Sequence, residues 1–207
     1  MTAAFTLHGN VNSQPATRIA LFFRLAGIPF SYRHVDLRNG QQKTPEYLAI
    51  NRFGRVPTLV HGAHSLSESS VILTYLAEQT GKFGGHSAAE KLRLAEWLSW
   101  LADVLLPVQR ARAVRKFNGD ANALPWIDAS AATGLALFEQ HLAGRTFIEG
   151  ERLTIADIFA FPWIDLLTES AVDPAKYPNI QAWADRVKAQ PGYAPQYELL
   201  PAHDAEL

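Results

Sequence analysis

The hydrophobic periodicity of this chain changes once, and that change limits the folds it can adopt. Up to about residue 80, short apolar runs of strand length alternate with stretches of helical spacing, whereas beyond residue 88 apolar residues recur only at helical spacing. Between these parts, residues 82–87 contain Phe-Gly-Gly-His, a composition typical of a connector that few contacts cross. A chain of 207 residues is long enough for two small cores. We therefore expect two domains, residues 1–81 and residues 88–207.

The first domain is predicted to combine a small sheet with helices. Pro15 and Pro45 fit the starts of helices, and Gly27 and Gly81 fit the positions just after helices. In chain order we expect a strand at 5–7, a helix at 15–26, a strand at 30–36, a helix at 44–50, strands at 57–60 and 65–66, and a helix at 69–80. This βαβαββα order is typical of an α/β domain of the thioredoxin-like type.

The second domain is predicted to be an all-α helical bundle. Apolar residues step by three and four along residues 94–105 and again along residues 180–187. The strongest local signal is the segment 153–158, which reads Leu-Thr-Ile-Ala-Asp-Ile. In it, Thr154 fits the N-cap of a helix and Asp157 fits the acidic position of a capping box. We expect both residues to be structural.

Charge and cysteine content exclude several classes of function. The chain has 19 lysines and arginines against 20 aspartates and glutamates, a formal charge of −1, so no general attraction to nucleic acid or to an anionic membrane is expected. Cysteine is absent, which excludes a disulfide scaffold, a cysteine-ligated metal site and a cysteine nucleophile. Any thiol chemistry must therefore use a thiol that a ligand brings, and the partner is expected to be small or apolar.

The first residues show no targeting signal. They carry no lysine or arginine ahead of an apolar stretch, and the apolar run at residues 19–23 is interrupted by Arg24. We expect neither a secretion signal nor a membrane span, and therefore a cytoplasmic location.

Three polar segments of the first domain each have a structural and a functional interpretation. Pro57 either begins an edge strand or is a cis-proline that turns the preceding backbone toward a ligand. Glu68 and Ser69 either cap a helix or form a cradle, in which helix amides and a hydroxyl hold a carboxylate and Glu68 holds an ammonium group. The loop at residues 10–15, Asn-Val-Asn-Ser-Gln-Pro, is on the structural interpretation an ordinary connection before a helix.

Taken in order, these segments resemble the glutathione transferase superfamily over almost the whole chain. The matching pieces are the polar loop with Ser13, Val56-Pro57 before the third strand, Glu68-Ser69 before the third helix, and Thr154 to Asp157 in the second domain. The resemblance implies a cytosolic enzyme of the serine type, which uses glutathione as co-substrate and attacks an apolar electrophile with its thiol. It also implies a two-fold homodimer, in which the first domain of one subunit packs on the helical domain of the other.

The resemblance also implies a role for each matching residue. Ser13 would be the catalytic hydroxyl, and Val56, with Pro57 in cis after it, would offer its backbone to the cysteinyl part of glutathione. Glu68 and Ser69 would hold the γ-glutamyl ammonium and carboxylate. The glycine carboxylate would be held by Gln42, Lys43 and Arg55.

Several functional alternatives stay open on the sequence alone. Serine cannot act as a base here, so Ser13 is expected to donate a hydrogen bond to the thiolate, with Asn10 or Asn12 as the alternative donor. The absence of cysteine disfavours thiol transfer through a mixed disulfide with the protein. Peroxide reduction, cis–trans isomerisation and a non-catalytic binding module are the alternative functions.

Two further clusters favour structural interpretations. His61 and His64 lie in a predicted hairpin without a third ligand, so no metal site is expected. The four cations at residues 110–116 are expected to complement the end of a long helix, with lining of the electrophile pocket as the alternative.

Overall fold

The computed structural model describes residues 4–207, and their contacts divide the chain into two compact units. Unit 1 contains the described residues up to Lys82 together with Gln190–Leu207, and unit 2 contains Phe83–Ala189. The segment expected as one domain, residues 88–207, is therefore divided, because its last residues return to unit 1. The sequence pattern missed this return because helical spacing does not reveal which core a helix joins.

Unit 1 is built on a five-stranded mixed sheet with the order β4-β3-β1-β2-β5. Its strands are β1 (Phe5–Gly9), β2 (Ser31–His34), β3 (Thr58–His61), β4 (His64–Ser67) and β5 (Ala205–Glu206). β1 and β2 are parallel, and the other neighbouring pairs are antiparallel. Its helices are α1 (Gln14–Ala26), α2 (Pro45–Ile50), α3 (Ser69–Thr80) and α9 (Gln196–Leu199), with the 3₁₀ turn η1 (Gln41–Lys43) before α2. The predicted βαβαββα order is confirmed.

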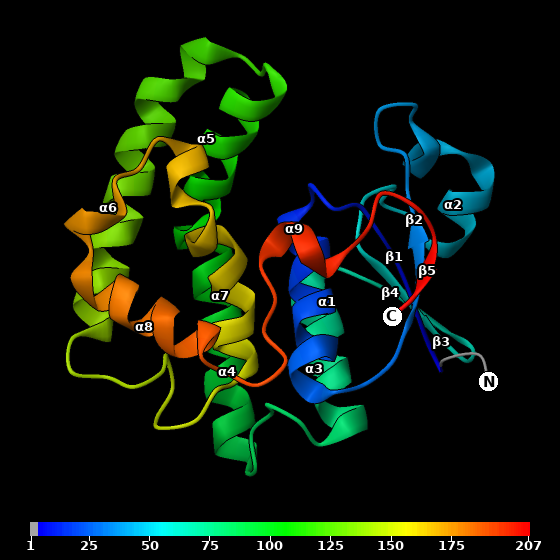
Figure 1. Cartoon of the computed structure of the whole chain (residues 1–207), viewed down its shortest axis with the longest axis horizontal. Coiled ribbons are helices and arrows are strands. Elements are labelled where there is room, and N and C mark those ends of the chain that lie inside the picture. Colours follow the sequence, from blue (N-terminus) through cyan, green and yellow to red (C-terminus); the bar gives the residue numbers. More distant parts are fainter. Residues whose placement is uncertain (1–3) are drawn as a thin grey trace. The chain divides into compact units, whose positions relative to one another are not determined.

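Helix α1 is the central helix of unit 1. It packs against β1, α3 and α9, and α1 and α3 lie side by side next to the sheet (Figure 1). As a result it is buried on all sides from Ala16 to Phe23. The ring of Phe23 stacks on that of Phe30 at a centroid distance of 4.7 Å, which ties α1 to the start of β2. A polar side chain in the middle of this helix is therefore held away from water.

Strand β5 contradicts the expectation that no strand follows residue 88. It pairs with β2 at the edge of the sheet, and the backbones of Phe30 and Leu207 exchange two hydrogen bonds of 2.8 and 2.9 Å. Arg33 on β2 adds an ion pair with Glu206 at 3.1 Å. A strand of two residues is too short to show an alternating pattern, so periodicity could not have predicted it.

Unit 2 is helical, as predicted, and no strand occurs among residues 83–189. Its helices are α4 (Ala88–Val104), α5 (Leu106–Phe117), α6 (Leu124–Leu142), α7 (Ile155–Asp165) and α8 (Pro178–Lys188), with the 3₁₀ turns η2 (Ala121–Ala123), η3 (Leu167–Ser170) and η4 (Pro174–Lys176). Helix α7 is buried from Ile155 to Ile164, and Trp183 of α8 packs edge-on against Phe138 of α6 at 5.3 Å. In the described chain, no helix is both long and apolar enough to cross a membrane.

The start of α7 carries the predicted capping box. Thr154 Oγ1 accepts a hydrogen bond from Ala156 N at 3.3 Å, and Asp157 Oδ2 accepts one from Thr154 N at 2.8 Å. The other carboxylate oxygen of Asp157 accepts bonds from Ile148 N at 2.9 Å and from the Trp183 indole at 2.8 Å. Burial raises the pKa of the Asp157 carboxyl, and these hydrogen bonds oppose the rise. Thr154 and Asp157 thus join α7 to the preceding loop, and Asp157 also joins it to α8.

The cations at the end of α5 pair with acids of the same unit. Arg115 makes an ion pair of 2.7 Å with Asp128, and Lys116 makes one of 3.0 Å with Glu169. Arg112, whose side chain is 3% exposed, also pairs with Glu169 at 2.7 Å. These contacts favour the structural interpretation of the cluster.

Candidate functional site

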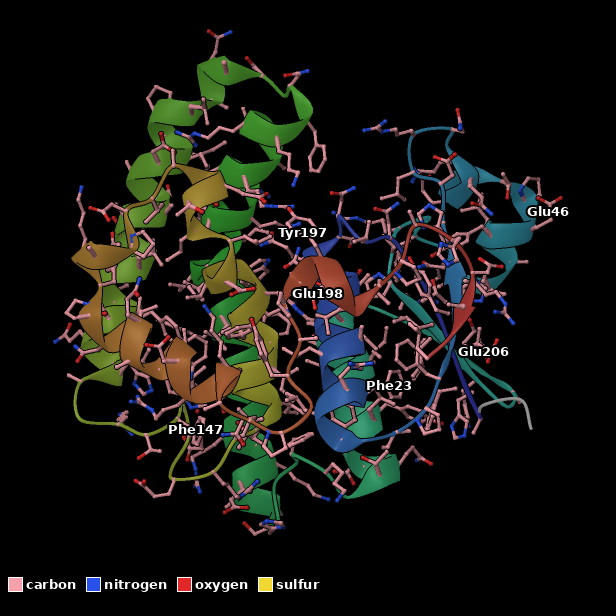
Figure 2. The ribbon with its side chains drawn as sticks, in the orientation of Figure 1. Phe23, Glu46, Phe147, Tyr197, Glu198 and Glu206 are labelled. Carbon is pink, nitrogen blue, oxygen red and sulfur yellow. The ribbon has the colours of Figure 1, made fainter. Side chains whose placement is uncertain are left out.

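The residues predicted to bind a ligand all lie in unit 1, on four segments. Ser13 lies on the loop between β1 and α1, four residues lie on η1 and the turn before β3, and two begin α3. Gln42 and Lys43 lie on η1, Arg55 and Val56 lie on the turn before β3, and Glu68 and Ser69 begin α3. In Figure 2 the labelled Glu46 marks α2, which follows η1 directly. Close contacts join η1 to the turn before β3, and a hydrogen bond joins α1 to the start of α3, as described next.

Ser13 is the N-cap residue of α1. Its backbone is extended, with φ −89° and ψ 103°, and its Oγ accepts a hydrogen bond from Ala16 N at 3.3 Å. A hydroxyl oxygen that accepts from a helix amide still has its own proton to donate. The N-terminus of α1 also carries the positive end of the helix dipole. The Ser13 hydroxyl is therefore placed to stabilise an anion.

Asn10 holds the loop that carries Ser13. Its side-chain Nδ2 donates to Val35 O at 3.0 Å, and its Oδ1 accepts from Asn12 N at 3.0 Å. Its backbone oxygen accepts from Ser13 N at 2.9 Å, and the residue is 9% exposed. Asn10 thus has a positioning role, which disfavours it as the alternative donor to sulfur and leaves Asn12 as that alternative.

The peptide bond between Val56 and Pro57 is cis, as predicted. Two buried side chains hold the turn that leads to it: the Tyr47 hydroxyl and Asn51 Nδ2 both donate to Arg55 O, at 2.9 and 2.7 Å. Both side chains also bond Thr58 Oγ1 at 2.8 Å. Sequence reasoning did not find Tyr47 and Asn51, because in a six-residue helix and the residue after it no pattern distinguishes a buried polar side chain from an exposed one.

Folding brings η1 against the turn before β3 at Gly54. A Cβ at Gly54 would lie 2.9 Å from both Gln42 O and Lys43 Nζ, and the φ of Gly54 is +56°, so both the space and the backbone require glycine. Lys43 Nζ lies 3.5 Å from Phe53 O, and the side chains of Lys43 and Arg55 are exposed. Gln42 Oε1 is buried and finds no hydrogen-bond partner among residues 4–207. The basic residues that the sequence places 12 positions apart therefore share one surface region.

Glu68 and Ser69 form the start of α3 as predicted, with one unpredicted neighbour. Glu68 is exposed and has a φ of 67°, which turns the chain sharply into the helix. Ser69 is 8% exposed, and its Oγ accepts a hydrogen bond of 2.9 Å from Arg18 Nη1 on α1. The sequence signal that could have identified Arg18 is its place beside apolar residues in the helix predicted at residues 15–26.

The two hairpin histidines show a structural arrangement. His61 Nδ1 and the Tyr75 hydroxyl are 2.8 Å apart, and both histidine rings pack against the ring of Tyr75. Among residues 4–207, no three histidine, aspartate or glutamate side chains are grouped as they would be around a metal ion.

The donor set of unit 1 fits glutathione, which carries a thiol, two carboxylates and an ammonium group. Ser13 offers a hydroxyl at a helix N-terminus, and Lys43 and Arg55 offer exposed cations for a carboxylate. The start of α3 offers the Ser69 hydroxyl for a second carboxylate and the exposed Glu68 carboxylate for the ammonium group.

A thioredoxin-like unit with this donor set, followed by an all-helical unit, is the architecture of glutathione transferases. Sequence comparison assigns the chain to the same class. The family model "Glutathione S-transferase, N-terminal domain" matches residues 13–79, and "Glutathione S-transferase, C-terminal domain" matches residues 101–191. The chain belongs to the glutathione S-transferase family.

Relatives support this assignment along most of the chain. The disulfide-bond oxidoreductase YfcG of Escherichia coli (strain K12) is 31% identical over 84% of this chain and 86% of its own. A glutathione S-transferase from Pseudomonas fluorescens Pf-5 has a TM-score of 0.89 at 25% identity, over 94% of this chain and 99% of its own. A glutathione transferase family member from the same organism, crystallised with two glutathione bound, has a TM-score of 0.86 at 25% identity, over 95% of this chain and 93% of its own.

Proposed function

We propose that this protein binds glutathione in unit 1 and transfers its thiolate to an electrophilic small molecule. The observation that carries the proposal is the Ser13 hydroxyl, which caps the positive end of α1 and keeps a proton to donate. A free cysteine thiol has a pKa near 8.5, so about 3% of it is thiolate at pH 7. Lowering that pKa by ~2 units, worth ~2.7 kcal/mol, makes thiolate the main form.

The remaining site residues bind and orient glutathione. The Val56 backbone pairs with the cysteinyl part, which the cis-proline and the hydrogen bonds to Arg55 O hold in place. Glu68 takes the γ-glutamyl ammonium and Ser69 the γ-glutamyl carboxylate. The glycine carboxylate lies at the region shared by Gln42, Lys43 and Arg55.

A second candidate reaction is disulfide reduction with two glutathione molecules. It is favoured by similarity to a relative named disulfide-bond oxidoreductase and to one crystallised with two glutathione bound. Because this chain has no cysteine, both thiols must come from glutathione. A small disulfide then gives two thiols, while two glutathione molecules become glutathione disulfide.

A substrate panel separates these reactions. Purified protein with glutathione is tested on an aryl halide, an isothiocyanate, a hydroperoxide and a small organic disulfide. Turnover of the first two supports the transferase proposal, and turnover of the disulfide alone supports the second candidate. Binding of glutathione without turnover of any substrate would contradict both and leave a binding module.

Alanine at Lys43 or Arg55 should weaken glutathione binding without slowing turnover at saturation. An exposed carboxylate contact is the same in the ground and transition states, so its loss appears in KM. Exposed ion pairs contribute about 0.2–1 kcal/mol, so each KM should rise by a factor of about 1.4 to 5. Arg52→Ala is the matched control, because Arg52 is an exposed cation in the same turn. If the Lys43→Ala/Arg55→Ala double variant keeps its affinity, the carboxylate lies elsewhere.

The homodimer and the cytoplasmic location are part of this proposal. The expected mass in solution is about twice the 22.9 kDa of one chain. A mass close to that of a single chain at micromolar concentration would contradict the dimer.

A further inference from the structure

Arg18 is a buried cation in the central helix of unit 1. It lies on α1 five residues after Ser13, and it is 1% exposed. Burial lowers the pKa of its guanidinium to about 9, so the group is still protonated at neutral pH. Burying a charge costs free energy unless neighbouring groups pair with it or accept its hydrogen bonds, so the partners of Arg18 are considered next.

A hydrogen bond connects Arg18 to the start of α3. Its Nη1 donates to Ser69 Oγ at 2.9 Å, across the packing of α1 on α3. Because this Oγ accepts from the guanidinium, the Ser69 proton is directed to another acceptor. A hydroxyl polarised by a cation is also a stronger donor than an isolated one. The buried charge is thus coupled to a side chain at the surface end of a helix.

The start of α3 adds positive potential at the same place. α3 is a 12-residue helix, and the first backbone amides of a helix have no partner within it. A helix N-terminus, a polarised hydroxyl and a guanidinium behind that hydroxyl together favour an anion. Glu68 precedes them and is exposed, so it leaves a place for a cationic group beside the anion.

We propose that Arg18 is a positioning residue for glutathione, and that it attracts the γ-glutamyl carboxylate through the Ser69 hydroxyl. This inference rests on the proposed function. One hydroxyl separates the guanidinium from the carboxylate, which places the charges about 5–6 Å apart. At that distance the attraction is substantial in a site poor in water.

The spacing along α1 agrees with this placement. Five helical residues rise roughly 7.5 Å, which separates Ser13 from Arg18 along the axis. The thiol of glutathione is on its central residue, and the γ-glutamyl group extends from there by about the length of two residues, roughly 7 Å. One glutathione molecule therefore has the length to reach the Ser13 hydroxyl with its thiol and the start of α3 with its γ-glutamyl group.

The test compares two ligands by titration calorimetry at pH 7. One is glutathione, and the other is 4-aminobutanoyl-cysteinylglycine, which keeps the amine and the thiol but lacks the γ-glutamyl carboxylate. Arg18→Met should weaken glutathione about 10- to 100-fold and change the affinity of the analogue by less than about 3-fold. In kinetics, KM for glutathione should rise while kcat at saturation stays close to that of the wild type.

Matched variants separate this role from a purely structural one. Arg24→Met removes a cation from an exposed position of the same helix and should leave both affinities unchanged. Arg18→Lys keeps the charge and should restore part of the affinity for glutathione. Ser69→Ala should also weaken glutathione and not the analogue. The double variant with Arg18→Met should bind glutathione almost as well as Ser69→Ala alone, because Arg18 acts through the Ser69 hydroxyl. If Arg18→Met does not fold, Arg18→Lys and Ser69→Ala carry the test.

The outcomes distinguish this inference from the proposed function. If the wild-type protein does not bind glutathione, the proposed function is wrong and the inference fails with it. If the wild type binds glutathione but the variants bind both ligands as the wild type does, the inference alone is overturned. Equal weakening of both ligands also overturns it, because that result shows a general disturbance of the site.

Discussion

Replacing Ser13 with alanine is expected to reduce kcat at pH 7 by about 10- to 100-fold while leaving the affinity for glutathione nearly unchanged. The lost hydrogen bond stabilises only the thiolate, and a bond to a charged group contributes about 1.5–3 kcal/mol. The pKa of the bound thiol should therefore rise by roughly 1–2 units. The pH–rate profile should move up by the same amount, and the rates of the two proteins should converge at high pH.

Ser87→Ala is the matched control for this experiment. Ser87 is also an N-cap residue, and its side chain accepts a hydrogen bond from Glu90 N at 3.2 Å. Both variants lose a helix cap, which costs about 1 kcal/mol of stability, but only Ser13→Ala should change the pH profile. An unchanged profile in Ser13→Ala would transfer the donor role to Asn12 and leave the glutathione-binding proposal intact.

Replacing Asp157 with alanine should strongly destabilise unit 2. The substitution leaves buried donors of Thr154, Ile148 and Trp183 without their acceptor. Removing the acceptor of several buried donors is expected to cost about 3–5 kcal/mol. For a chain of this length the unfolding midpoint should fall by about 6–20 °C, as measured by circular dichroism on heating.

Two variants show whether that loss comes from the buried hydrogen bonds. Asp165→Ala removes a carboxylate from the last residue of the same helix, where it pairs with Lys188 at 3.2 Å, and should cost less than Asp157→Ala because one ion pair is lost rather than the acceptor of three buried donors. Asp157→Asn keeps one acceptor oxygen and should fall between the two. Equal midpoints for Asp157→Ala and Asp165→Ala would show that the capping box contributes little.

The local elements and the outline of the site could be predicted from the sequence. Period-two and helical spacings identify the strands and helices of unit 1, and Thr154 with Asp157 identifies the start of α7, because these signals depend on neighbours a few residues apart. The cis bond before Pro57 followed from the resemblance to a known family. These features require no knowledge of which segments meet in space.

The missed features all depend on contacts between distant segments. Arg18 meets Ser69 across 51 positions, and β5 pairs with β2 across more than 170. Tyr47 inside the short helix α2 and Asn51 just after it support the turn before Pro57, and the sequence pattern there gives no reason to expect burial. Propensity and spacing describe a segment by itself, so a polar side chain buried by a remote partner looks like a surface residue.

The pairing of β5 with β2 also has a consequence for synthesis of the chain. Ser31 and Glu206, which β5 brings together, are 175 positions apart. At 5–20 residues per second, β5 is synthesised roughly 9–35 s after β2, and until then this edge of β2 has no neighbouring strand. During that interval a nascent chain exposes an unpaired strand edge, the kind of surface on which other chains add. Arg33 on that strand is then a solvated charge that opposes such pairing before it meets Glu206.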